Sequence, residues 1–454
     1  MALFPKPADV SSVADELQPL IRMLTGGELP LGLRAWDGSR AGPPDAEVTV
    51  VVHSPRALQH LLWAPGELGL ARAHVQGHLD IEGDVFALLG LRHRLADNGD
   101  DVSIKLSAKD WAGLARTAYR LGAIARRPPL PPEEAHLHGL VHSLRRDSSA
   151  IHHHYDVGND FYRLILGPSL TYSCAYWREP EMDLADAQAA KYELICAKLG
   201  LEPGMRLLDV GCGWGSMVMH AALHHGVEAV GVTISHEQAE LARRRVREAG
   251  LDGQVEIRVQ DYRVIQDGPF DAISSIGMFE HVGLDRMHLY LRQLRSLLRP
   301  EGRLLNHAIS RPDPDTTTGI DKKSFIGRYV FPDAALLEVG TVISAMQRVG
   351  LEVRDVQSLR EHYDRTLRAW VTNLEARWDE AQQLVGPGRA RVWRLYLAGS
   401  ALGFAENRTS VHQVLSVRST PTGISSMPRT REGLDARWEP IDLRHNRPSG
   451  TVDH

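Results

Sequence analysis

A glycine-rich turn in the middle of the chain is the first candidate for binding chemistry. Leu207–Gly215 reads LLDVGCGWG, an apolar, strand-like run that enters a turn with glycines at Gly211, Gly213 and Gly215. Glycines there let the backbone approach a ligand closely and leave the amides of a following helix free to donate. The spacing differs from a P-loop and from the dinucleotide fingerprint. A plain strand-to-helix turn is therefore the alternative.

Two later strand ends carry further candidates. Gly231–Ser235 ends a second apolar run but lacks the acidic residue that often binds ribose hydroxyls. The third run ends in Gln260, Asp261 and Tyr262, which place an acceptor and an aromatic ring where an adenine would bind. Asp261 could instead cap a turn.

Four more motifs make the pattern specific. They are His154–Tyr162 (HYDVGNDFY), Thr171–Trp177 (TYSCAYW), Met278–Gly283 (MFEHVG) and His362–Leu367 (HYDRTL). With the glycine turn, they resemble the cyclopropane-fatty-acid synthase family, S-adenosylmethionine-dependent enzymes that modify double bonds of lipid acyl chains. The resemblance covers about residues 136–418. Met1–Arg127 resembles, more weakly, the smaller N-terminal domain of the phospholipid-acting members.

The resemblance implies a cofactor site for S-adenosylmethionine. The positions that fall there are Tyr172, Ser173, Asp209, Gly211, Gly213, Gly215, Thr233, Ile234, Gln238, Asp261, Tyr262 and Ile276.

The resemblance also implies a bicarbonate ion beside the reacting methyl group. The residues at that place are Cys174, Glu280, His307, the backbone of Ile309, and Tyr363, with His154 and Tyr162 nearby. Each has a structural alternative, such as a buried thiol for Cys174, a helix-surface acid for Glu280 and a core histidine for His307. Family members often carry a cysteine where this chain has Ser400, so a thiolate mechanism from that position is excluded.

The implied reaction has two demands. An isolated alkene is a poor nucleophile, so the methyl donor must be activated and held in line. Methyl transfer then leaves a carbocation that must lose a proton before water reaches it. In the bicarbonate mechanism Glu280 accepts the O–H of the ion and orients it. The expected product is a cyclopropane fatty acid, and the alternative is a 10-methylene fatty acid that a separate reductase would convert to a 10-methyl branch.

Composition limits the other functions. The 454 residues contain 43% hydrophobic and 24% charged residues, which is typical of two or three globular domains. A formal net charge of -5 gives no global basic field, so we expect no nucleic-acid partner. The three cysteines form no C-x-x-C pair, and the histidines in residues 136–154 show no ligand spacing, so we predict no metal.

The same features predict where the protein acts. The N-terminus lacks a secretory signal, and no apolar run approaches bilayer-spanning length. We therefore expect a cytoplasmic enzyme, peripheral at the inner membrane surface, that acts on unsaturated phospholipid acyl chains as a homodimer.

The elements that must position these residues form an α/β fold. The predicted strands are Met205–Val210, Glu228–Thr233, Val255–Val259, Phe270–Ile276, Arg303–Ile309, Glu352–Leu359 and Val411–Val417. Their alternation with helical patterns predicts a doubly wound, seven-stranded, Rossmann-like methyltransferase domain with a parallel sheet over residues 151–418. Ser235 and Gln238 have the spacing of a capping box at a helix start.

The rest of the chain divides around a proline-rich stretch. Residues 1–127 are predicted to be a smaller α+β accessory domain, lipid- or membrane-associated, with a strand at Val48–Val52, a strand, turn and strand over Ala71–Val85, and a helix over about 110–127. Pro128–Pro132 opens a linker over residues 128–150, and residues 419–454 form a tail predicted to be partly disordered.

Two other functions remain open from the sequence. A methyltransferase acting on a small hydroxyl or amine substrate would need the cofactor site but not Cys174, Glu280, His307 and Tyr363. A non-enzymatic lipid-binding or transfer protein would need neither.

Overall fold

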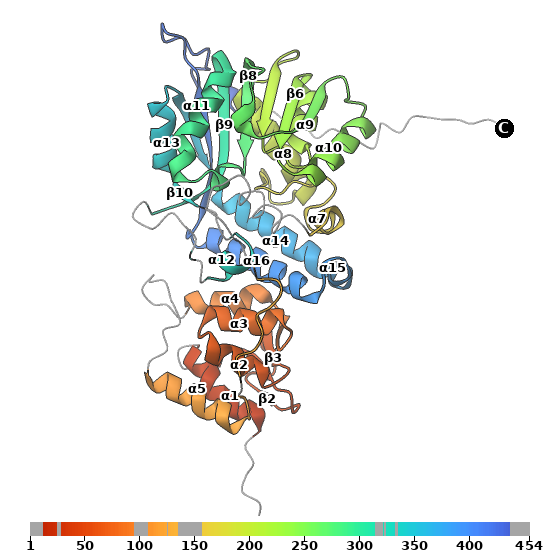
Figure 1. Ribbon diagram of the computed structural model, residues 1–454, viewed down its shortest axis with the longest axis vertical. Coiled ribbons are helices and arrows are strands. Elements are labelled where there is room, and N and C mark those ends of the chain that lie inside the picture. Colours follow the sequence, from red (N-terminus) through yellow and green to blue (C-terminus); the bar gives the residue numbers. More distant parts are fainter. Residues whose placement is uncertain are drawn as a thin grey trace, which may run out of the picture.

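Two β-sheets organise the chain in the computed structural model (Figure 1). The structure describes residues 12–24, 29–94, 108–124, 126–134, 157–313, 321, 324–331 and 335–435. A four-stranded sheet belongs to the N-terminal part, and an eight-stranded sheet lies in the C-terminal part. His154 and the histidines of residues 136–154 lie outside the described residues.

The eight-stranded sheet confirms the predicted α/β fold. Its strands run in the order β11 (Glu352–Ser358), β12 (Ser410–Val417), β9 (Leu298–Arg311), β8 (Phe270–Ile276), β5 (Arg206–Val210), β6 (Glu228–Thr233) and β7 (Val255–Val259). A short strand, β10 (Leu337–Glu338), pairs with β9 and is an addition to the seven predicted strands. The prediction of a parallel sheet is wrong at one edge, because β12 is antiparallel to both β9 and β11.

Helices cover both faces of this sheet, as its apolar strands require. On one face, α8 (Leu184–Leu199), α9 (Ser216–His225) and α10 (His236–Glu248) share a core with Leu207 of β5. On the other, α11 (Met287–Leu297) and α13 (Val339–Arg348) pack with Leu208 of the same strand. The side chains of Leu207 and Leu208 thus lie on opposite faces of the sheet, because side chains alternate along a strand.

The predicted start of α10 is confirmed, but the capping box is incomplete. The Ser235 side chain accepts a hydrogen bond from the Gln238 amide at 3.3 Å, which satisfies one of the free donors at the helix start. The Gln238 side chain does not return to Ser235. Its oxygen accepts a hydrogen bond from the Thr233 hydroxyl at 3.0 Å instead.

In its described residues, the N-terminal part combines a small sheet with five helices. The sheet order is β2 (Arg40–Ala41), β1 (Gly32–Arg34), β3 (Val48–Val52) and β4 (Leu79–Gly83). The helices are α1 (Val13–Leu24), α2 (Arg56–Trp63), α3 (Glu67–Val75), α4 (Val85–Arg94) and α5 (Ala108–Arg120). The strand at Val48–Val52 is confirmed.

Two local predictions in this part are wrong. Ala71–Val85 does not form two strands, because its first residues belong to α3, whose small side chains Ala71 and Ala73 pack in the core. Only β4 is extended. The helix predicted to reach residue 127 ends at Arg120, because Gly122 adopts a φ of 66° and the amide of Ala123 bonds back to Ala118.

Three consecutive helices lie between the two sheets in Figure 1: α14 (Arg360–Ala376), α15 (Trp378–Val385) and α16 (Pro387–Ala405). Helix α16 contacts the N-terminal part through Arg391, which pairs with Asp80 at 3.1 Å, and Arg394, which donates to the carbonyl of Ile81 at 3.0 Å. A buried ion pair between Arg72 and Glu134 adds a second contact, since the Tyr329 hydroxyl donates to the same carboxylate at 3.1 Å. Tyr329 belongs to α12 (Phe325–Tyr329).

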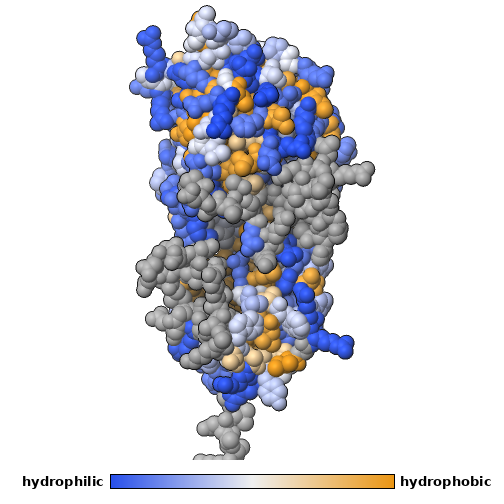
Figure 2. Space-filling model, turned by 60° about the vertical axis from the view of Figure 1, so that its left-hand side comes forward, coloured by the Kyte–Doolittle hydropathy of each residue, from blue (hydrophilic) through white to orange (hydrophobic). Residues whose placement is uncertain are grey.

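Among the described residues, no helix is long and apolar enough to cross a bilayer. On the face drawn in Figure 2, the coloured residues alternate between hydrophilic and hydrophobic patches.

Candidate active site

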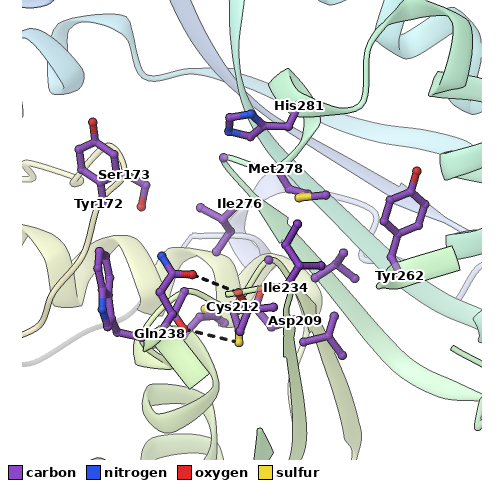
Figure 3. Close-up of a pocket in the computed structure, with 18 of the residues that line it drawn as sticks. Tyr172, Ser173, Asp209, Cys212, Ile234, Gln238, Tyr262, Ile276, Met278 and His281 are labelled. Carbon is purple, nitrogen blue, oxygen red and sulfur yellow. Dashed lines mark hydrogen bonds between the residues drawn. The ribbon is translucent and has the colours of Figure 1, made fainter. Parts of the chain in front are cut away.

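A cavity of about 170 Å³ opens at the carboxyl ends of β5, β6, β7 and β8. This is the edge where ligands bind in open α/β sheets. Eleven of the twelve residues predicted to hold the cofactor line it: Tyr172, Ser173, Asp209, Gly211, Gly213, Thr233, Ile234, Gln238, Asp261, Tyr262 and Ile276. Gly215 does not line the cavity and instead caps the start of α9 with a φ of 80°. Figure 3 shows Tyr172 and Ser173 on one side of the space and Tyr262 on the other.

The glycine turn shapes one wall of this cavity. The amides of Gly211 and Cys212 both donate to the carbonyl of Val232 at 2.9 Å, which holds the turn against β6. Gly213 has a φ of 53°, and a Cβ there would meet no protein atom within 4 Å. A side chain at Gly213 would therefore take up free space beside the cavity, in a backbone conformation that disfavours it.

Asp261 caps a turn and also lines the cavity. Its side chain caps the turn at Tyr262–Val264 by accepting the Arg263 amide at 2.9 Å, and it also lines the cavity. Burial disfavours its charged form, but hydrogen bonds and charge from Arg263 outweigh burial and lower the pKa of Asp261. The carboxylate is therefore ionised and oriented, as an acceptor for a ligand hydroxyl must be.

A buried lysine in the cavity wall was missed by the sequence analysis. Lys191, from α8, is fully buried, donates to the Ser173 hydroxyl at 3.1 Å and lies 3.6 Å from the centre of the Tyr192 ring. Burial lowers its pKa to about 7, against the opposing charge of Asp209. Burial raises the pKa of Asp209 to about 6, although its carboxylate accepts a bond from Ser274 at 2.6 Å.

No sequence motif marks Lys191, because a lysine in a helix normally faces water. Only its burial against Ser173 and Asp209 identifies it. His281 was also missed as a cavity residue, although the predicted motif Met278–Gly283 contains it. Burial lowers the pKa of His281 to about 4, so its ring is neutral at pH 7.

Glu280 and His307, predicted for the bicarbonate site, lie deeper than the cavity lining. Glu280 follows β8 in a short 3-10 helix and is 7% exposed, and His307 on β9 is 2% exposed. Burial raises the pKa of Glu280 to about 7 and lowers that of His307 to about 3. Among the described residues, Glu280 Oε2 and His307 Nε2 are both buried without a hydrogen-bond partner.

The backbone of Ile309, also predicted for the bicarbonate site, contacts Glu280. Its amide donates to Glu280 Oε1 at 2.7 Å, so it holds the carboxylate in place. Residues 307 and 309 share one face of β9, because side chains alternate along a strand. Glu280 is thus fixed on the strand that carries His307.

Cys174 and Tyr363 meet at one backbone carbonyl. The Cys174 thiol lies 3.6 Å from the oxygen of Leu359, and the Tyr363 amide donates to that oxygen at 3.1 Å. The amide of Leu359 in turn donates to Val411, which pairs with Ile309 across β12 and β9. Burial raises the pKa of the Cys174 thiol far above its usual range, so it is protonated and is no nucleophile at neutral pH.

The two groups of predicted residues are connected but distinct. None of Cys174, Glu280, His307, Ile309 and Tyr363 lines the large cavity. The Tyr172 hydroxyl, from the cavity wall, is 2.9 Å from the Tyr396 hydroxyl, whose pKa burial and nearby Glu280 raise to about 12. Tyr162 lies in the same aromatic cluster, with its ring 5.6 Å from that of Tyr172.

The strand order, the glycine turn after β5 and the lined cavity together define an S-adenosylmethionine-dependent methyltransferase. The model of the mycolic acid cyclopropane synthetase family matches residues 142–414. The chain belongs to that family, as the motifs had predicted.

Relatives extend the similarity to nearly the whole chain. A probable fatty acid methyltransferase of Mycobacterium tuberculosis is 43% identical over 91% of this chain and 96% of that protein. A probable fatty acid methyltransferase of Pseudomonas putida is 37% identical over 92% of this chain and 99% of its own. Cyclopropane-fatty-acyl-phospholipid synthase of Escherichia coli is 38% identical over 60% of this chain and 68% of its own.

A solved structure agrees with the fold. Mycolic acid cyclopropane synthase CmaA1, complexed with SAH and CTAB, is 34% identical with a TM-score of 0.56, over 59% of this chain and 97% of that one. The aligned region is therefore about as long as the C-terminal part of this chain.

Proposed function

We propose that this enzyme transfers the methyl carbon of S-adenosylmethionine to the cis double bond of an unsaturated phospholipid acyl chain. The resulting carbocation loses a proton to a bound bicarbonate ion, and ring closure gives a cyclopropane fatty acid. The observation that carries the proposal is that Glu280 Oε2 and His307 Nε2 are both buried without a hydrogen-bond partner in a chain whose cavity is lined by the predicted cofactor residues.

The cavity residues fit the cofactor. S-adenosylmethionine supplies an activated methyl group, because its sulfonium sulfur makes a good leaving group. Asp261 offers an ionised acceptor for ribose hydroxyls, and Tyr262 an aromatic surface beside it. Lys191 and Asp209 present a cation and a carboxylate from adjoining walls, which complements the charged amino-acid end of the cofactor.

The buried pair fits a small protonated anion. The neutral His307 ring faces Gln413 through Nδ1 at 3.3 Å, and an amide donor there leaves Nε2 as the N–H donor. An ionised Glu280 offers Oε2 as an acceptor. One unpartnered donor and one unpartnered acceptor match the O⁻ and O–H of bicarbonate, which would supply a base small enough to reach the substrate.

Aromatic side chains enclose the region where positive charge develops. The Tyr172 ring lies 5.4 Å from that of Trp370 and 6.0 Å from that of Trp393, between ring centres. Trp370 and Trp393 are almost fully buried. Such rings exclude water and stabilise a desolvated cation by about 2 kcal/mol for a good contact.

A 10-methylene product, the precursor of a 10-methyl branch after a separate reductase, is the second candidate. It needs the same first step, but the proton is lost after a hydride shift. The names of two relatives favour it, because two proteins that match over nine-tenths of this chain are probable fatty acid methyltransferases rather than cyclopropane synthases.

We also propose that the enzyme works as a homodimer at the inner membrane surface. Acting on a bilayer favours two membrane contacts over one, because the second contact becomes intramolecular. The support for the dimer is that the proposed substrate, a phospholipid, lies in a bilayer.

The test is incubation with methyl-labelled S-adenosylmethionine and vesicles of unsaturated phospholipid, followed by proton NMR of the recovered acyl chains. High-field cyclopropyl protons support the proposal, and vinylidene protons support the second candidate. Mass alone cannot separate the two isomers. Label in neither kind of acyl product, from a protein that binds the cofactor, would overturn both and favour a small-molecule methyltransferase.

A further inference from the structure

A cluster of metal-binding side chains lies behind the cofactor cavity, between α8 and α9, which pack side by side (Figure 1). One donor atom each of Cys196, His220 and His225 lies within 4.8 Å of the other two. Glu193 joins them, because its Oε2 is 3.3 Å from His220 Nε2 and 3.0 Å from His225 Nε2. Nothing in the proposed reaction uses these four side chains.

We propose that Cys196, His220, His225 and Glu193 form a site for a divalent cation of the zinc class that joins α8 to α9.

The donor set fits such an ion. Thiolate and imidazole are the ligands that Zn²⁺ prefers, at bond lengths of about 2.3 Å for sulfur and 2.0–2.1 Å for nitrogen. Tetrahedral donors at these lengths stand roughly 3.5 Å apart. The Glu193 oxygen already has this spacing to both imidazoles. The three donors within 4.8 Å must close by roughly 1 Å, which side-chain rotation supplies.

The cluster also lies away from bulk water, since the Glu193 side chain is 16% exposed and Cys196 is fully buried. A divalent cation bound there would displace the thiol proton, because Zn²⁺ binds the thiolate form of cysteine.

The position of the site suggests a structural role. The His220 ring lies 5.7 Å from the ring of Tyr192, which lines the cofactor cavity beside Lys191. An ion that fixes His220 against α8 would stabilise this wall without touching the reacting groups.

Cobalt is the sharpest probe, because only a thiolate ligand gives sulfur-to-cobalt charge-transfer absorption in the near ultraviolet. Untagged, metal-stripped protein is titrated with Co²⁺. We expect one equivalent to produce this band, and Zn²⁺ to displace the cobalt and raise the melting midpoint by a few degrees. The histidines of residues 136–154 cannot imitate the band, since that stretch contains no cysteine.

Two variants and a control decide the assignment. Cys196→Ser abolishes the band, and His225→Ala, at a partly exposed position, weakens Co²⁺ binding at least about tenfold. His236→Ala removes an exposed histidine at the start of α10, outside the cluster, and leaves the band unchanged. No band in the wild-type protein, or an equal band in Cys196→Ser, would overturn the proposal. Cofactor binding, measured in parallel, tests the proposed function separately.

Discussion

The cofactor cavity and the buried region of Glu280 and His307 are built in different ways. The cavity is open, and its walls come mainly from the carboxyl ends of parallel strands that follow one another in the chain. Glu280 and His307 are instead buried, Glu280 in the short 3-10 helix that follows β8 and His307 on β9. The first region therefore binds a large ligand through backbone shape. The region of Glu280 and His307 can orient a small ligand, because its buried polar atoms have few other hydrogen-bond partners.

This difference separates binding from chemistry. Substitutions in the cavity should change cofactor affinity, whereas substitutions around Glu280 should change turnover. Four experiments test that division, and the largest effect is expected at the buried acid.

Glu280→Gln keeps the size of the side chain but removes its charge. We expect turnover to fall by about 10³-fold, because the oriented acceptor for the proton-removing ion is lost. S-adenosylmethionine affinity, measured by calorimetry, should stay within about twofold, since Glu280 does not line the cavity. Equal losses in turnover and affinity would mean that Glu280 belongs to the cofactor site and that the division is wrong.

Glu280 also predicts a pH dependence of stability. Its pKa is raised from 4.5 to about 7 in the folded protein, so the folded state keeps a proton that the unfolded state releases. This contribution is fully present below pH 4.5 and is lost as the pH rises through 7, a total of about 3 kcal/mol. Urea unfolding of wild type and Glu280→Gln from pH 4.5 to 8 measures it.

The comparison with Glu280→Gln cancels the contribution of other buried groups such as Lys191. The free energy of unfolding of the wild type should fall relative to the variant as the pH rises. A constant difference across this range would show that Glu280 is not buried as the structure has it.

Gly213→Ala tests the cavity side of the comparison. The added methyl group enters the space beside the glycine turn, so we expect cofactor affinity to fall about tenfold while turnover at saturating cofactor changes little. Gly250→Ala is the matched control, because Gly250 also has a positive φ, of 68°, and open space around it, but does not line the cavity. Similar affinity losses in both variants would assign the effect to backbone strain.

Tyr396→Phe tests the contact between the two regions and should have the smallest effect. It removes the hydroxyl that lies 2.9 Å from that of Tyr172 on the cavity wall. We expect turnover to fall about threefold and affinity to stay nearly constant, in line with one hydrogen bond worth about 1 kcal/mol. Tyr172→Phe should lower both quantities. The reverse pattern would place Tyr396 in the cofactor site.

The sequence alone predicted the cofactor cavity better than the buried region of Glu280 and His307. Strand ends, the glycine turn and Asp261 depend on local patterns, and parallel strands bring their carboxyl ends to one edge by topology. The unpartnered atoms of Glu280 and His307 depend on long-range packing, as does the Glu280 bond to the Ile309 amide. No spacing within the chain encodes those contacts.

The errors have the same origin. Ala71–Val85 alternates as a strand would, but α3 formed because its small residues pack against neighbouring helices, which a local pattern does not contain. The antiparallel direction of β12 likewise depends on where α14–α16 return the chain.

By itself the sequence determined the order of strands and helices, the glycine turn and the family, because periodicity and turn chemistry act over a few residues. Only the tertiary structure decided which polar groups lost water. Burial of Lys191, Glu280 and His307 sets their charge states, and the meeting of α8 with α9 brings Cys196 to two histidines. Desolvation depends on everything packed around a group, and residues distant in the chain supply most of that packing.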